Sequence, residues 1–152
     1  MSMLSDFKEI EVSLETIILA NGFEKVFEKT GKFGAEFLYK AEDGLYFQIK
    51  CDYQDRLILL FIGHRYILKN EPDQYFISGP YKLVVRACSD SFEEVLQVKD
   101  YSGWQEYSKK LITYLASSLP VVLERLTPAM LEEFAQLRIN RRPPQFHFCR
   151  AD

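Results

Sequence analysis

The two histidines, His64 and His147, are the side chains of this sequence best suited to proton transfer near neutral pH. His64 follows a glycine at the end of an apolar segment, so it is a candidate general base at the rim of a sheet. A base of this kind needs a positioned partner, and the sequence has no nucleophile motif such as GxSxG. We therefore predict no catalytic residue, and a small enzyme that uses His64 is retained as an alternative.

Other chemistry-bearing patterns are incomplete. His147 and Cys149 are two residues apart, but a structural zinc site needs four ligands, and no HxxxH or CxxC spacing supplies the others. The seven glycines form neither GxxxxGK[ST] nor GxGxxG. The acidic pairs Glu93-Glu94 and Glu132-Glu133 fall in predicted helices, where neighbouring side chains point about 100° apart and do not converge. We predict neither a metal nor a cofactor.

Acidic and aromatic residues recur in the turns of the predicted sheet, and they are the strongest candidates for a binding site. If these turns lie at one edge, they form an acidic patch that steers a basic partner, with tyrosines as rigid anchors. The candidate partner-binding residues are Asp52, Tyr53, Asp55, Glu71, Asp73 and Tyr75. The alternative is that these are the polar residues of ordinary loops.

The net charge of −3 and the isoelectric point of about 5.5 argue against a general nucleic-acid binder and against a protein of anionic membranes. Residues 138–152 depart from this average, because they hold four arginines against Asp152 alone. The rest of the chain is therefore more acidic, which suits a basic protein partner. Arg141-Arg142 with Phe146 and Phe148 leaves contact with single-stranded nucleic acid as an alternative, and a solvated tail as another.

Cysteine usage and hydropathy bear on the compartment. Cys51, Cys88 and Cys149 are odd in number and far apart, which favours a reducing environment over a disulfide framework. Residues 1–22 contain acidic residues and lack the apolar core of a signal peptide. The longest apolar run, Leu57–Ile62, is too short to span a bilayer. We predict a cytoplasmic protein that binds no membrane; its oligomeric state is not predicted.

Hydrophobic periodicity predicts a helix first and antiparallel strands after it. Apolar residues at 7, 10, 14, 17 and 18 share one helical stripe, and Asp6 and Glu9 have the spacing of a capping box. Asn21-Gly22 is typical of a helix C-terminus, and Asp43-Gly44 of a hairpin turn. From about residue 25 the period becomes two. The strands are expected near residues 36–40, 45–53, 57–62, 75–77 and 82–87.

Helical spacing returns after Cys88. We expect a short helix at 91–96, a longer one capped by Ser102 and interrupted at Pro120, and a third that begins at Thr127-Pro128. The prediction is a single α+β domain over residues 1–142: an N-terminal helix, an antiparallel meander of about five strands, and C-terminal helices packed on the sheet. A Pro-led tail, residues 143–152, follows it.

This layout resembles small bacterial immunity proteins of contact-dependent inhibition and related polymorphic-toxin systems. The resemblance covers roughly residues 7–125. It is carried by the helix that ends in Asn21-Gly22-Phe23, by FQIKCDYQDR at 47–56, by the strand end Ile62-Gly63, and by SFEEVL at 91–96 ahead of a C-terminal helix. It implies an α+β fold and the neutralisation of a cognate toxin by stoichiometric binding. Many such toxins are nucleases with basic substrate grooves, which would suit the acidic body.

The main hypothesis is thus a non-catalytic immunity protein that binds a basic protein toxin, in some cases a nuclease, without turnover. A structural or adaptor subunit that associates with itself is the first alternative, and it predicts a large apolar surface patch. The small enzyme is the second, and it predicts a deep pocket around a base with a shifted pKa.

Overall fold

The computed structural model describes residues 3–67, 74–127, 129–130 and 148–150, and its first element is helix α1 (Met3–Ala20). The predicted stripe of α1 is confirmed, because its inward side chains are almost fully buried. These are Phe7, Ile10, Leu14 and Ile18. The helix begins at Met3, so Asp6 lies within its first turn and the predicted capping box is wrong. The predicted end is confirmed: Gly22 takes a φ of 91°, a left-handed conformation that glycine adopts without strain.

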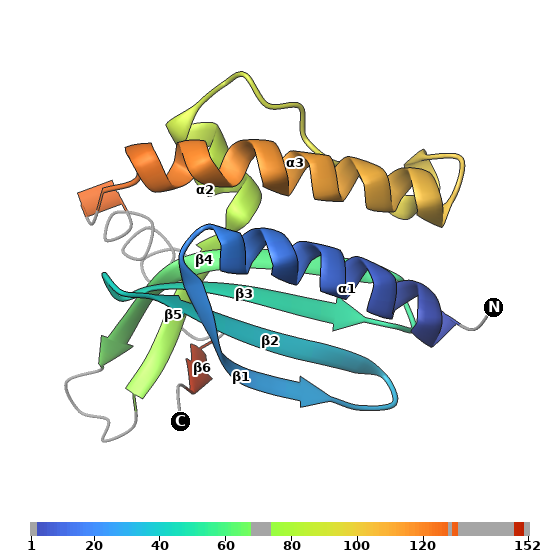
Figure 1. The fold of residues 1–152 in the computed structure, drawn as a ribbon, viewed down its shortest axis with the longest axis horizontal. Helices are drawn as coiled ribbons and strands as arrows, with labels where there is room; N and C mark the ends of the chain where they lie inside the picture. Colours follow the sequence, from blue (N-terminus) through green and yellow to red (C-terminus); the bar gives the residue numbers. More distant parts are fainter. Residues whose placement is uncertain (1–2, 68–73, 128, 131–147, 151–152) are drawn as a thin grey trace.

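Six antiparallel strands form one sheet in the order β1-β2-β3-β4-β5-β6, so the α+β class is confirmed (Figure 1). Four of the five predicted strands are present, and the strands at residues 23–30 and 148–150 were not predicted. The strands are β1 (Phe23–Thr30), β2 (Gly34–Ala41), β3 (Leu45–Asp52), β4 (Leu57–Ile67), β5 (Gln74–Pro80) and β6 (Phe148–Arg150). The predicted hairpin turn joins β2 to β3, where Gly44 has a φ of 87° and the Asp43 carboxylate accepts the N–H of Leu45. In the next turn, the Asp52 carboxylate accepts the N–H groups of Gln54 and Asp55.

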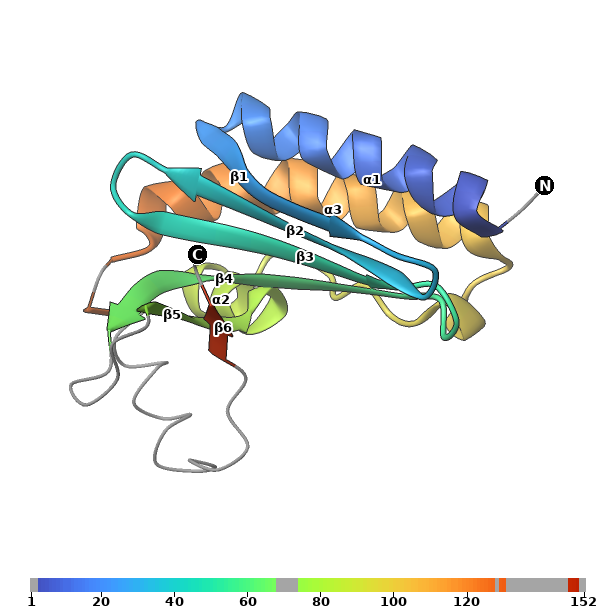
Figure 2. The ribbon, with the colours of Figure 1, turned by 90° about the horizontal axis from the view of Figure 1, so that it is seen from below.

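The helices lie along one side of the sheet and make the main core with it (Figures 1 and 2). Because side chains alternate along a strand, β3 sends Phe47, Ile49 and Cys51 to the helices. On the opposite face, Leu38 and Tyr46 form a separate buried pair.

Residues 82–87, predicted as a strand, instead belong to helix α2 (Tyr81–Cys88). The buried positions are Tyr81, Val84, Val85 and Cys88, whose spacing of three and four residues is that of a helix. The run Leu83-Val84-Val85 suggested a strand because it is apolar and contains two β-branched valines. The tertiary contact decides otherwise: the hydroxyl groups of Tyr81 and Ser118 lie 2.6 Å apart in the core, which joins α2 to the following long helix.

The predicted helix at 91–96 is also wrong. This segment is irregular, and only a 3₁₀ turn, η1 (Val98–Asp100), follows it. Phe92, Val95, Val98 and Tyr101 are half-buried against the core, so every third side chain points inward. A spacing of three resembles one side of a helix, which explains the wrong prediction.

Helix α3 (Trp104–Arg125) is longer than predicted, because it continues through Pro120. Proline removes one helical hydrogen bond. The helix is held on both sides of that position by buried residues, with Leu115, Leu119 and Val122 fully buried. The predicted cap at Ser102 is wrong, because the N-cap of the helix is Gly103. The hydroxyl of Ser102 donates instead to the Glu106 carboxylate at 3.1 Å.

The C-terminal segment is only partly described. The helix predicted at Thr127-Pro128 lies mostly outside the described residues. The prediction that regular structure ends at Pro143-Pro144 is wrong, because Phe148–Arg150 forms β6 and pairs with Tyr75–Ile77 of β5.

Candidate functional site

The β4–β5 ladder stops before β4 does, and this leaves a slot in the sheet. In this ladder Phe61 pairs with Pro80 and Ile62 with Gly79, so a longer β5 would place residues 81–84 opposite Leu60 to Leu57. Those residues instead turn away as the first turn of α2. Leu57–Leu60 pair with β3 on one side and have no partner strand among the described residues on the other. We call this edge the β4 slot.

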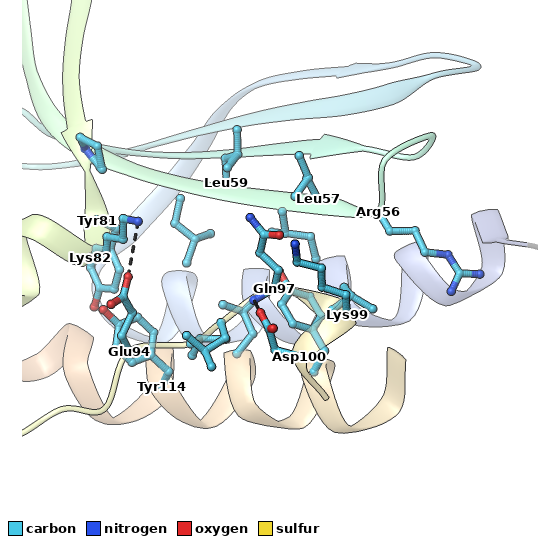
Figure 3. A pocket seen from close by; sticks show the side chains of 18 of the residues that line it. Arg56, Leu57, Leu59, Tyr81, Lys82, Glu94, Gln97, Lys99, Asp100 and Tyr114 are labelled. Atoms are coloured by element: carbon cyan, nitrogen blue, oxygen red, sulfur yellow. Dashed lines mark hydrogen bonds and ion pairs between the residues drawn. The ribbon is translucent and has the colours of Figure 1, made fainter. Parts of the chain in front are cut away.

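A groove of about 690 Å³ lies beside the β4 slot. Its opposite wall is the segment 94–100, and its floor comes from α3 through Tyr107, Leu111 and Tyr114. Figure 3 shows the side chains of Gln97 and Lys99 extending from that wall toward β4. Much of the lining is aliphatic, and two of its leucines on opposite walls are large exposed residues: Leu59 is 45% exposed and Leu96 is 53% exposed.

The backbone of the β4 slot presents hydrogen-bonding groups to the groove. The N–H of Tyr53 donates to the carbonyl of Phe33 on the β2 side, so Cys51, two residues earlier, also directs its backbone groups toward β2. Its partner Ile58 therefore directs its own backbone groups away from β3, and a hydrogen bond between the Ile58 backbone and the Tyr107 side chain agrees with this. Burial raises the pKa of Tyr107 to about 12, and this bond opposes the rise. Because backbone direction alternates along a strand, Leu60 also directs its N–H toward the slot.

Two charged side chains of the groove are paired with each other, and a third binds the backbone of the wall. Glu94 receives Lys82 at 3.4 Å and Arg86 at 3.3 Å, and the first of these pairs crosses the end of the groove (Figure 3). Asp100 accepts the backbone N–H of Gln97 at 3.2 Å. These interactions connect the wall to α2 and brace its turn at 97–100, so the groove has apolar walls and polar ends.

The turn between β3 and β4 places two of the predicted binding residues at one end of this groove. Asp55 is exposed, and Asp52 is half-buried with its carboxylate bound to the turn. Arg56, which follows them, lines the groove. Tyr53 does not belong to this surface. It is 7% exposed, its ring packs on Phe7 with centroids 4.8 Å apart, and it serves the core.

The other predicted binding residues are not brought to the same place. Glu71 and Asp73 lie outside the described residues. Tyr75 pairs with Tyr66 near the far end of β4, and the 11 residues of that strand span roughly 36 Å. The condition for a single acidic patch, that Tyr75 and Asp55 share one edge, is therefore not met. The backbone of His64 pairs with Leu45 and Ile77, and its side chain is outside the described residues, as are Arg141-Arg142 and Phe146.

A second polar cluster lies between α1 and the sheet. The Glu11 carboxylate, 9% exposed, accepts the Tyr53 hydroxyl at 3.2 Å and also the thiol of Cys51. Burial raises the pKa of Glu11 above its usual value of 4.5, while these two hydrogen bonds oppose the rise. Burial and the Glu11 charge both raise the pKa of the Cys51 thiol far above its usual value, so this cysteine stays protonated. The cluster fastens α1 to the sheet.

The groove was not predicted from the sequence. Its wall was predicted as a helix, and the residues that leave β4 unpaired were predicted as a strand. The available signal was Pro80, which cannot donate to a ladder and so favours the end of β5, together with the apolar residues Leu57–Leu60.

No family model, curated protein or solved structure matches the chain. Among the described helices, none combines the length and the apolar character that a bilayer crossing requires. In the same part of the chain, no three His, Cys, Asp or Glu side chains form a group that could hold a metal ion.

Proposed function

We propose that this chain is a non-catalytic binding protein that neutralises a basic protein toxin by forming a stoichiometric complex with it. The observation that carries the proposal is the groove beside the β4 slot: an apolar recess with a free strand edge and with acidic residues on the segments that frame it. Extended segments of partner proteins bind to such edges through backbone hydrogen bonds, and side-chain pockets supply specificity.

Charge supports a basic partner. The two segments that frame the groove, 52–56 and 89–101, contain six acidic residues against Arg56 and Lys99, and Lys82 and Arg86 of α2 pair with one of the six, Glu94. The balance of these residues is still negative. Opposite charge on a partner accelerates association and selects against acidic competitors. Exposed leucines at the centre with charges around them are the usual anatomy of a protein interface.

Self-association is the second candidate function, and the same open edge favours it. An unpaired strand edge pairs with any suitable strand, including the same edge of a second copy. A concentration-dependent dimer that buries the groove would support this adaptor role in place of the inhibitor role.

The test is capture followed by neutralisation. The tagged chain is used to isolate partners from source cells, and each captured protein is then expressed in a bacterial host alone or together with this chain. We expect one basic protein that stops growth alone and is tolerated in the co-expression. The proposal is wrong if no captured protein is toxic, or if co-expression gives no protection.

A matched pair of variants locates the surface. Asp55→Lys reverses an exposed charge at the groove end of β3, and Glu42→Lys makes the same change in the turn at its opposite end. We expect the first to weaken capture at least tenfold and the second to leave it unchanged. Equal effects would show that binding depends on the overall charge of the chain and not on the charge at this end of the sheet.

A further inference from the structure

We propose that the β4 slot takes one extended, apolar segment of the partner, flanked by basic residues, as an added strand beside Leu57–Leu60. This inference rests on the proposed function, which it deepens by naming the chemistry of the bound segment. The slot is the place that β5 would occupy if it continued past Pro80, so an added strand there would extend the existing β4–β5 ladder along β4.

Backbone geometry supports an added strand over a side chain inserted alone. The N–H of Leu60 and the C=O of Ile58 both point into the slot, because Ile58 and Leu60 share one backbone direction, which the ladders of β3 with β2 and with β4 fix. An incoming strand can accept from the first and donate to the second. The open length of four residues is roughly 13 Å, which is long enough for a short strand.

The residues around the slot determine which side chains the bound segment of the partner can have. On the helix side, alternate residues meet Leu60, Leu111 and Val95, so they must be apolar. On the outer side they lie next to Leu57 and the exposed Leu59, where an apolar or β-branched residue also fits.

Charge at the two ends of the slot favours basic flanks. One end carries Asp52, Asp55 and Asp100 against Arg56 and Lys99. In Figure 3 Arg56 extends away from the other groove residues, so it does not stand over the slot. At the other end, Glu94 is already paired with Lys82 and Arg86, but Asp90 and Glu93 of the same segment add negative charge beyond it.

The experiment uses the full chain and a defined probe, the acetylated and amidated peptide KKVTIVKK. Binding is measured by calorimetry, and exchange of the Leu60 amide by nuclear magnetic resonance. We expect a dissociation constant in the micromolar to low millimolar range and at least tenfold slower exchange at Leu60. A peptide with acidic flanks, EEVTIVEE, should bind at least tenfold more weakly, and so should KKVTIVKK with alternate backbone nitrogens methylated.

Two variants at position 60 distinguish the contribution of the backbone N–H to peptide binding from that of the side chain. Leu60→Pro removes the N–H that points into the slot, at a place where it is not needed for the ladder with β3. Leu60→Ala removes a similar amount of side chain and keeps the N–H. We expect the proline variant to lose peptide binding at least tenfold relative to the alanine variant. If the proline variant does not fold, binding of the methylated peptide and amide exchange at Leu60 in the unchanged chain still show whether the peptide pairs with the backbone of the slot.

Several results would overturn the inference. Equal binding to both variants would show an apolar groove without strand addition, and preference for the acidic flanks would reverse the chemistry of the partner. A stable dimer of the free chain that occupies the slot would make a second copy the occupant. A toxin neutralised equally well by Leu60→Pro would leave the proposed function intact and remove the slot from it. Peptide binding without any neutralised toxin would support strand addition at the slot and contradict the proposed function.

Discussion

Strand β1 and the first residues of β4 each leave one backbone edge without a partner strand among the described residues, but the two edges differ in sequence. In β1, FEKVFEKT, charged residues fill four of eight positions, and the pairing register shifts at Val26 between Lys25 and Phe27. Charged residues, lysine in particular, and bulges are the usual protection of an edge against unwanted pairing. The β4 slot, LILL, has neither.

The two edges also differ in the residues that lie next to them. Lys25 of β1 is paired with Glu15 of α1 at 2.8 Å and with Glu28 at 3.0 Å, so its charge is fixed over the edge strand. The β4 slot faces a groove, and the side chain of Tyr107 reaches its backbone. One edge thus carries charges and a bulge, while the other is apolar and lies open toward a recess.

The largest effect is expected from the anchor that diverts the chain away from β4. Tyr81→Ala removes a side chain that is 1% exposed and should lower the free energy of unfolding by about 3–5 kcal/mol, as for other buried aromatic residues. Tyr81→Phe keeps the ring and loses only the contact with Ser118, at a cost of about 1 kcal/mol. Urea denaturation measures both. Similar values for the two variants would show that the hydroxyl, and not the packing of the ring, holds α2.

The next effect concerns the polar cluster that holds α1 over the β1 side of the sheet. Tyr53→Phe leaves the Glu11 carboxylate without one of its donors and should cost about 1–3 kcal/mol at pH 7. Burial raises the pKa of Glu11 in the folded state, so the folded protein holds this proton more tightly than the unfolded chain does. The free energy of unfolding should therefore fall as the pH rises from about 4.5 through the raised pKa.

Glu11→Gln isolates that titration. The amide keeps an acceptor for Tyr53 but cannot ionise, so the fall over this range of pH should disappear. Urea denaturation at a series of pH values compares it with the unchanged chain. The same decline in both would assign it to a group other than Glu11.

A smaller effect tests the open edge itself. Leu59→Glu gives the β4 slot a charge of the kind that protects β1, opposite Lys50 in the ladder. Because Leu59 is 45% exposed, the free energy of unfolding should change by less than about 0.5 kcal/mol. Light scattering at high concentration should show less self-association, and Phe27→Glu on β1 should show no such change. A reduction by Phe27→Glu alone would place the adhesive edge on β1.

The smallest effect is expected from the protection of β1. Lys25→Ala removes the pairs with Glu15 and Glu28, and since the Lys25 side chain is 33% exposed, the cost should stay below about 1 kcal/mol. Added salt should reduce the difference further. A loss above 2 kcal/mol in denaturation experiments would show that β1 depends on this pair and not on its ladder with β2.

Local signals were enough to predict most of the sheet. The helix end at Gly22, the hairpin turn at Gly44 and the alternation in 45–52 each follow from backbone or side-chain preferences of a few neighbouring residues. The assignment of 82–87 depended on a contact between distant residues, because Tyr81 becomes helical where it can meet Ser118 of α3. Local propensity does not contain that information.

The candidate site shows the same division. Asp52 and Asp55 were identified as turn residues from the sequence, and they do frame the groove. Tyr53, between them, was predicted to be an anchor for a partner protein. Its hydroxyl has a hydrogen-bond partner inside the protein instead, Glu11, which is 42 residues away in the sequence. The groove could not be predicted, since it exists only where β5 departs from β4.

Strands β1 to β5 lie in the sheet in their order along the chain, so each of them pairs with the strand made just before it. Pairing of sequence neighbours lowers the contact order, and proteins with low contact order fold faster. The sheet can thus assemble strand by strand from the first hairpin. β6 is the exception, because its partners at residues 75–77 precede it by α2, α3 and the connecting segments. Its addition closes a long loop, and we expect it to be the last step in the formation of the sheet.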